Sequence, residues 1–142
     1  MNNANPIKLD ELQVGDELPG IEIPLTLQRL VMEAGSNRDF SLIHHDSEVA
    51  RSTGAPDAFA NTYFLMGMFE RLMREWGGPA VQIRKIGPLR MSSFNTVGDT
   101  LAFEGCVESV DAASGAVQLN LWVESDRGRT VTCKASIEVG GS

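Results

Sequence analysis

The stretch DAFANTYFLMGMFERLMREWGGP, residues 57–79, carries the strongest helical pattern in the chain. Its large apolar residues recur at helical spacing and form one wide face: Phe64, Leu65, Met68, Phe69, Leu72, Met73 and Trp76. Glu70 and Arg74 stand four residues apart on the polar side, and the sequence GGP at 77–79 ends the pattern. A helix with so wide an apolar face needs a broad surface to cover it.

Strand patterns in the second half of the chain supply that surface. Apolar and polar residues alternate over 117–123 and 131–139, which is typical of antiparallel strands with one buried face. We predict two further strands at 81–91 and 100–110, joined around Val97-Gly98-Asp99, and hairpin turns at DAASG and SDRGR. A long helix on a curved antiparallel sheet is an α+β architecture, and we expect the hot-dog fold, in which the sheet wraps around a central helix.

Residues before the central helix predict smaller elements. Residues 15–24 read as a turn and a short strand. A helix follows with Thr26 as its N-cap, an apolar stripe and Gly35 as its end; the stripe is Leu27, Leu30, Val31 and Ala34. Asp46 is predicted to cap a short helical turn that runs to Gly54.

The composition fits a single domain over residues 1–142. The net charge of -7 argues against nucleic-acid binding, which needs a basic face. No apolar run approaches the roughly 18 residues of a membrane span, and the N-terminus has no apolar signal-peptide core. Cys106 and Cys133 form no CxxC pair, so we expect a reducing cytoplasm, and two adjacent histidines argue against a metal site.

The stretch SNRDFSLIHHD, residues 36–46, gathers Asp39, His44, His45 and Asp46 in one irregular loop. Taken alone, a loop Asp is usually a cap and a loop His is usually solvated. Together, Asp39 and His44 can point into one small space between helix and sheet, where they would hold a water and move its protons. An imidazole with an ordinary pKa of about 6.5 suits such proton transfer around neutral pH.

Residues 39–46 resemble the D-x-N-P-x-H-x-D signature of MaoC-like, R-specific enoyl-CoA hydratases. The resemblance extends from LQVGDELPGIEIPLT through the helix to Gly98-Asp99, and so covers most of the chain. It implies a hot-dog enzyme that adds water across the 2,3 double bond of an acyl-CoA thioester, with no cofactor beyond the CoA of the substrate. It implies that Asp39 and His44 are the catalytic pair, with His45 and Asp46 as supporting residues.

The chain departs from that family at two places. Ser41 and Leu42 stand where the family usually has Asn and Pro, so the loop lacks a stiffener. Ala60-Asn61 stands where the family commonly has His-Gly at the start of the central helix. The resemblance then implies that the backbone N–H of Asn61 binds the thioester oxygen, since an N–H at a helix N-terminus can stabilise a developing enolate.

A narrower resemblance concerns subunit composition. The segments RDF, HHD, DAFANTYF, REWGGP and IRKIGPLRM look like short MaoC-like subunits of heteromeric bacterial hydratases. Those enzymes act on CoA thioesters of shortened steroid side chains and pair the short catalytic subunit with a second MaoC-domain subunit that has lost the pair. The alternative is a homodimeric hydratase for short linear acyl-CoA.

Other functions of a hot-dog domain stay open at this point. Acyl-carrier-protein dehydratases and many thioesterases use an acid on the central helix, for which Asp57 and Glu70 are the candidates; Asp57 equally suits an N-cap, and Glu70 an ion pair with Arg74. A noncatalytic acyl-CoA binding subunit would lack Asp39 or His44, and both are present. The basic run over 71–90 could meet CoA phosphates, or be a solvated face or a subunit interface.

Overall fold

The computed structural model describes residues 7–140, the side chain of residue 80 excepted. One antiparallel five-stranded sheet has the order β1-β3-β4-β5-β2; its strands are β1 (Glu17–Pro24), β2 (Val81–Met91), β3 (Thr100–Asp111), β4 (Ala116–Ser125) and β5 (Gly128–Val139). The helices are α1 (Leu27–Asn37), α2 (Ser47–Ser52) and α3 (Thr62–Gly77), with short 3-10 turns η1 (Leu9–Glu11), η2 (Leu42–His44) and η3 (Gly78–Ala80). The chain has the predicted α+β hot-dog architecture.

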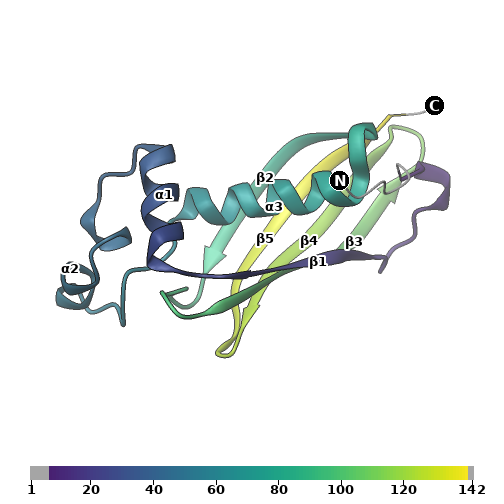
Figure 1. Ribbon diagram of the computed structural model, residues 1–142. Coiled ribbons are helices and arrows are strands. Elements are labelled where there is room, and N and C mark those ends of the chain that lie inside the picture. The colour runs from purple at the N-terminus through teal and green to yellow at the C-terminus, as the bar shows by residue number, and fades with distance from the viewer. Residues whose placement is uncertain (1–6, 141–142) are drawn as a thin grey trace.

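Helix α3 lies along one face of the curved sheet (Figure 1). Its predicted apolar face is buried, except that Trp76 is only partly covered. Phe69 packs edge-on against Phe103 of β3 at 5.4 Å between ring centroids. The core therefore sits between α3 and the inner faces of the strands, where buried residues of β4 and β5 alternate with partly buried or exposed ones, as predicted.

Strands β2 and β3 follow each other in the chain but are not neighbours in the sheet. β2 pairs with β5 at one edge, whereas β3 lies between β1 and β4. The two predicted hairpins join β3 to β4 and β4 to β5. Within the described residues, β1 and β2 are the edges of the sheet.

The prediction that the central helix begins near Asp57 is wrong, because α3 begins at Thr62. Residues 58–60 are extended and pair with residues 95–97 of the β2–β3 connection: the Ala60 N–H donates to Asn95 O at 2.9 Å, and the Val97 N–H donates to Ala58 O at 2.9 Å. Local helix formers are overridden here by these hydrogen bonds to a distant segment.

Helix α1 has the predicted cap but a different end. The Thr26 hydroxyl accepts from the Arg29 N–H at 3.1 Å. Gly35 does not end the helix, which runs on to Asn37 and is closed by Arg38 in the left-handed conformation, φ 56°. The buried stripe is also narrower than predicted, since Leu27 and Val31 are 39% and 47% exposed. Within residues 7–140, no helix is long and apolar enough to span a membrane.

Candidate active site

The loop after α1, with η2 and α2, lies beyond one end of the sheet, beside the start of α3 (Figure 1). Arg38 reverses the chain after α1, and the Asp39 N–H then donates to Ala34 O at 2.9 Å. The Asp39 side chain also accepts the Ser41 N–H at 3.2 Å, a local Asx turn. These contacts hold Asp39 at the start of the loop, although Ser41 and Leu42 stand where the resembled family usually has Asn and Pro.

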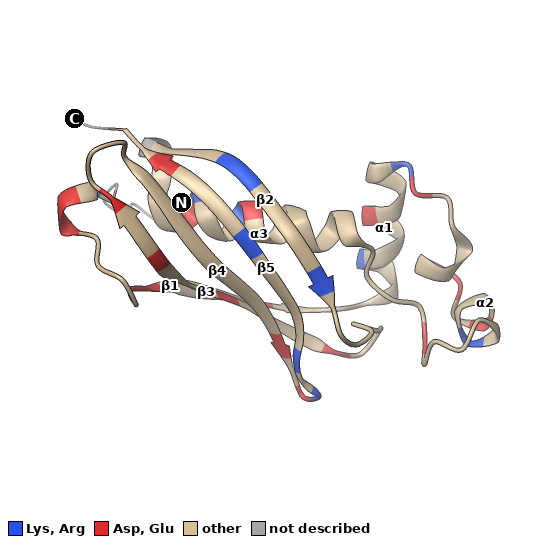
Figure 2. Cartoon of the chain, turned by 180° about the vertical axis from the view of Figure 1, so that it is seen from behind, with Lys and Arg blue, Asp and Glu red and all other residues tan. Residues whose placement is uncertain are grey.

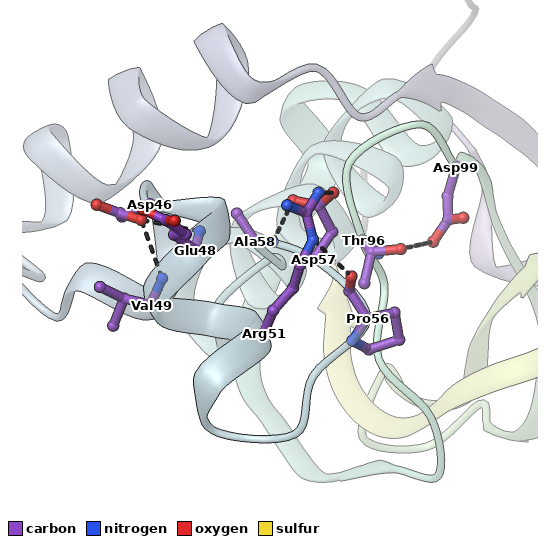
Figure 3. A network of polar contacts seen from close by, with 9 residues as sticks. All are labelled: Asp46, Glu48, Val49, Arg51, Pro56, Asp57, Ala58, Thr96 and Asp99. Carbon is purple, nitrogen blue, oxygen red and sulfur yellow. Dashed lines mark hydrogen bonds and ion pairs between the residues drawn. The ribbon is translucent and has the colours of Figure 1, made fainter.

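His44 is 8% exposed and is held by Phe59. Its Nδ1 lies 2.8 Å from Phe59 O, and its ring packs edge-on against the Phe59 ring at 5.0 Å. The Phe59 carbonyl is itself fixed, because residues 58–60 are hydrogen-bonded to residues 95–97. Asp99 secures that second segment by accepting the Thr96 N–H at 2.6 Å and its hydroxyl at 3.3 Å (Figure 3).

Asn61 connects the start of α3 to the loop. Its Oδ1 accepts the Phe64 N–H at 2.8 Å, which caps the helix. Its Nδ2 donates to Asp39 Oδ2 at 2.9 Å. The residue that the sequence marked for its backbone amide thus also positions the loop carboxylate with its side chain.

The predicted pair is in contact: His44 Nε2 lies 3.3 Å from Asp39 Oδ2. Because Phe59 O can only accept, the Nδ1 of His44 carries a hydrogen. In a neutral imidazole Nε2 then has a lone pair, so two acceptors face each other. A water that donates to both would satisfy this arrangement, as would protonation of His44. The geometry suits a site where a proton is held or moved.

The environment of Asp39 favours its charged form. The hydrogen bond from Asn61 is the largest cause that holds the pKa of this carboxyl below its usual value, with lesser effects from the Ser41 N–H and from His44 and His45. Burial opposes these contacts but does not cancel them. Asp39 therefore stays ionised across the neutral range, as an acceptor for a water must.

The N-terminus of α3 offers donors beside this pair. The backbone N–H of Asn61 has no acceptor within hydrogen-bonding reach among the described residues. A free N–H at a helix N-terminus, on the positive end of the helix dipole, suits an oxygen that becomes negative. Asn61 lies next to Asp39, to which its side chain is hydrogen-bonded, and the role of its backbone N–H stays a prediction.

The other residues of the loop motif have separate places. His45 is partly buried and follows η2 as its C-cap. Asp46 caps α2 as predicted: its Oδ1 accepts the N–H groups of Glu48 and Val49 at 2.9 and 3.0 Å (Figure 3). Asp46 is thus occupied in holding the loop's far end.

The two acids considered for a helical-acid mechanism are engaged elsewhere. Asp57 lies before α3 rather than on it, caps no helix, and pairs with Arg51 at 2.6 Å (Figure 3). Hydrogen bonds from Ser47 and the Ala58 N–H, and then the Arg51 contact, hold the pKa of Asp57 below its usual value. Glu70 forms the predicted pair with Arg74, 2.8 Å apart on the exposed side of α3.

The basic run over residues 71–90 is largely paired. Arg71 contacts Glu75 at 2.7 Å, Arg74 contacts Glu70, and Arg84 contacts Glu138 at 2.6 Å. Basic residues on β2 are visible in Figure 2. Lys85 and Arg90 of that strand have no acidic partner among the described residues.

Two features near the site were not foreseen from the sequence. One is the Phe59 carbonyl, which no sequence pattern marks. The other is Glu33 on α1, whose pKa is raised to about 7, first by burial and then by the charge of Asp39. Across the described residues, no group of three or more His, Cys, Asp or Glu side chains could hold a metal ion.

Comparison with known proteins gives the family. No protein-family model matches the chain. The chain is 30% identical over 129 residues to the 3-oxo-4,17-pregnadiene-20-carboxyl-CoA hydratase beta subunit of Mycobacterium tuberculosis, over 91% of this chain and 98% of that protein. It is 29% identical, with a TM-score of 0.85, to a chain of the ChsH1–ChsH2 complex of M. tuberculosis, over 90% of this chain and 98% of that one.

The (R)-hydratase of A. caviae involved in PHA biosynthesis has the same fold, with a TM-score of 0.84 over 92% of this chain and 98% of that chain, at 19% identity. Each of these comparisons covers at least 90% of this chain and 98% of the relative. The chain belongs to the MaoC-like hydratases of hot-dog fold.

Proposed function

We propose that this chain is the catalytic subunit of an enoyl-CoA hydratase, which adds water to a 2-enoyl-CoA to give a 3-hydroxyacyl-CoA. The observation that carries the proposal is the pair of facing acceptors, His44 Nε2 and Asp39 Oδ2, 3.3 Å apart beside the free amide of Asn61. A water beside the pair, donating one hydrogen to each acceptor, would have an oxygen lone pair free to attack C3 of the substrate.

The chemistry follows from these positions. As the water oxygen bonds to C3, one member of the Asp39–His44 pair takes a proton from it. The electrons of the double bond move toward the thioester oxygen, and the Asn61 N–H donates to that oxygen as its charge develops. The protonated member of the pair then delivers the proton to C2. The sum is one water added, and no group beyond the CoA thioester is needed.

The substrate and partner are proposed from the relatives. The relatives' names are those of a 3-oxo-4,17-pregnadiene-20-carboxyl-CoA hydratase beta subunit and of a two-component complex. We propose a steroid side-chain thioester as substrate and a second MaoC-domain subunit as partner, in the cytoplasm. The free edge of β2 and exposed apolar residues on α1 and near the start of α3 are compatible with a partner; these residues are Leu27, Val31, Met32 and Tyr63. Lys85 and Arg90 are candidates for contacts with CoA phosphates.

The test is hydration measured as loss of the enoyl-thioester ultraviolet absorbance. The chain is purified alone and after co-expression with a MaoC-domain partner, and each sample is given a steroidal and a short linear enoyl-CoA. We expect weak activity from the chain alone and restored hydration of the steroidal substrate in the complex, abolished by Asp39→Asn. Full activity of the isolated chain on the linear substrate would establish a homodimeric hydratase instead. If no sample hydrates either substrate, a noncatalytic acyl-CoA binding subunit is the remaining function.

A further inference from the structure

Glu33 is an acid in an unusual position on α1. Its Oε1 accepts the side-chain amide of Asn37, one turn later on the same helix. Its Oε2 is shielded from solvent and has no hydrogen-bond partner among the described residues. Since Oε1 takes an N–H donor, a proton on this carboxyl would reside on Oε2. An ionised carboxylate with one oxygen buried and unpaired is unfavourable.

The position of Glu33 relates it to the proposed active site. Glu33 and Phe64 line the same hollow of about 450 Å³ between α1, the end of β1 and the start of α3. Asn61 caps the Phe64 amide and donates to Asp39. Glu33 also precedes Ala34, whose carbonyl accepts the Asp39 N–H. A half-buried carboxyl and the proposed catalytic carboxylate therefore lie near the start of α3.

The charges around Glu33 do not favour its ionised form. On α1 itself, the Arg29 guanidinium donates to Pro24 O and Arg38 closes the helix. The elements in contact with α1 contribute His44 from η2 and Tyr63 from α3, and the loop between α1 and α2 adds Asp39, His45 and Asp46. Asp39 is the member of this set whose charge acts on Glu33; burial first, and then Asp39, raises the pKa of Glu33 to about 7.

We propose that Glu33 is a positioning residue of the Asp39–His44 pair: its uncharged form supports hydration, and its ionisation slows it. The inference rests on the proposed hydratase function. An ionised Glu33 would place a second negative charge near the oxygen that becomes negative during hydration, which disfavours that step. It would also raise the pKa of Asp39, since interaction between two carboxyls is reciprocal. The uncharged form leaves Asp39 as the ionised partner of the water.

The kinetic experiment uses the active assembly and compares Glu33→Gln with the wild type between about pH 6 and pH 8. Gln keeps the size and the Asn37 contact but cannot ionise. We expect the wild-type kcat/KM to fall about five-fold more over this range than that of Glu33→Gln, because only the wild type gains a charge. Glu22→Gln, an exposed acid on β1, is the matched control and keeps the wild-type profile. Identical pH profiles in Glu33→Gln and the wild type would overturn the proposal.

A second readout does not depend on activity. Carbon-13 NMR of glutamate-labelled protein follows the Glu33 carboxyl directly, with Glu33→Gln to assign the signal. We expect titration near neutral pH in the wild type and at lower pH in Asp39→Asn, where the like charge is removed. Titration at an ordinary pKa, unmoved by Asp39→Asn, would refute the inference about Glu33. Failure of the wild type to hydrate any enoyl-CoA would refute the proposed function and leave this result standing by itself.

Discussion

Asn61 donates its side-chain amide to Asp39 at 2.9 Å while its amide oxygen caps α3, so one residue joins a helix start to a loop acid 22 positions earlier. The same hydrogen bond is the largest cause of the lowered pKa of Asp39. Helix capping and the ionisation of Asp39 are therefore linked through a single side chain, and two substitutions can separate them.

Asn61→Ser keeps an oxygen for the cap and loses the donor to Asp39, whereas Asn61→Ala loses both. The folded pKa of Asp39 is depressed, so its stabilising contribution is present above the unfolded pKa and is lost as pH falls through the folded one. Both variants should raise that pKa and move the acid limb of kcat/KM to higher pH. In urea unfolding at neutral pH, Asn61→Ala should be about 1 kcal/mol less stable than Asn61→Ser, because only Asn61→Ala also loses the helix cap. An unmoved acid limb in both variants would contradict the link.

Asp39→Asn and His44→Ala should each lower the hydration rate roughly 10²- to 10⁴-fold, because each removes one side of the water site. The double variant should lose far less than the product of the single losses, since the two groups act as a unit. Circular dichroism serves as the control for folding. Near wild-type turnover by either single variant would exclude the assigned roles.

His45→Gln should keep at least about a tenth of the activity, a barrier change of under roughly 1.4 kcal/mol. His44, not His45, is hydrogen-bonded to Phe59 and contacts Asp39. Steady-state kinetics on the three variants His44→Ala, His45→Gln and the double variant check the assignment. An inactive His45→Gln beside an active His44→Ala would show that the register is off by one residue.

Period-2 alternation made the sheet predictable, because burial of one face constrains every second residue of β4 and β5. The start of α3 was not predictable in the same way. Ala58, Phe59 and Ala60 suit a helix locally, and only their pairing with residues 95–97 makes them extended. That pairing is a contact between distant parts of the chain, and single-sequence patterns do not report such contacts.

Asp57→Asn should retain at least about half of the hydration activity, since Asp57 pairs with Arg51 outside α3. Loss of this partly exposed pair should change the unfolding free energy by no more than about 1 kcal/mol. The enoyl-thioester absorbance assay measures the first quantity, and urea unfolding the second. A rate loss as large as that of Asp39→Asn would favour a dehydratase that uses Asp57.

Gly105→Ala should destabilise the sheet by about 1–3 kcal/mol, because the added Cβ would lie 2.5 Å from Leu121 Cδ2 and 3.0 Å from Asn120 O. β3 and β4 approach closely at this point, and the Asn120 carbonyl belongs to the backbone. Urea unfolding measures the loss. Gly67→Ala is the matched control, since a Cβ there meets nothing within 4 Å and the helix should gain slightly. Equal stability of Gly105→Ala and the wild type would show that the strands separate easily.

The candidate site was predictable only in part. The spacing within residues 39–46 and the family resemblance marked Asp39 and His44, and the structure brings the two side chains together. The partly buried environment of Glu33 could not be predicted, because a charged residue on an amphipathic helix usually faces water. Its surroundings come from the reversal of the chain after α1, which no helical periodicity encodes.

That reversal depends on Arg38, a residue other than glycine at φ 56°, immediately before Asp39. A side chain in this conformation is disfavoured, so a glycine would suit the backbone better there. Arg38→Gly would relieve the strain yet widen the range of directions open to the next residue in the unfolded and locally opened chain. Selection for thermal stability would favour glycine at this position if the relief of strain is the larger effect. Selection for turnover would favour arginine, because it restricts the direction in which Asp39 follows.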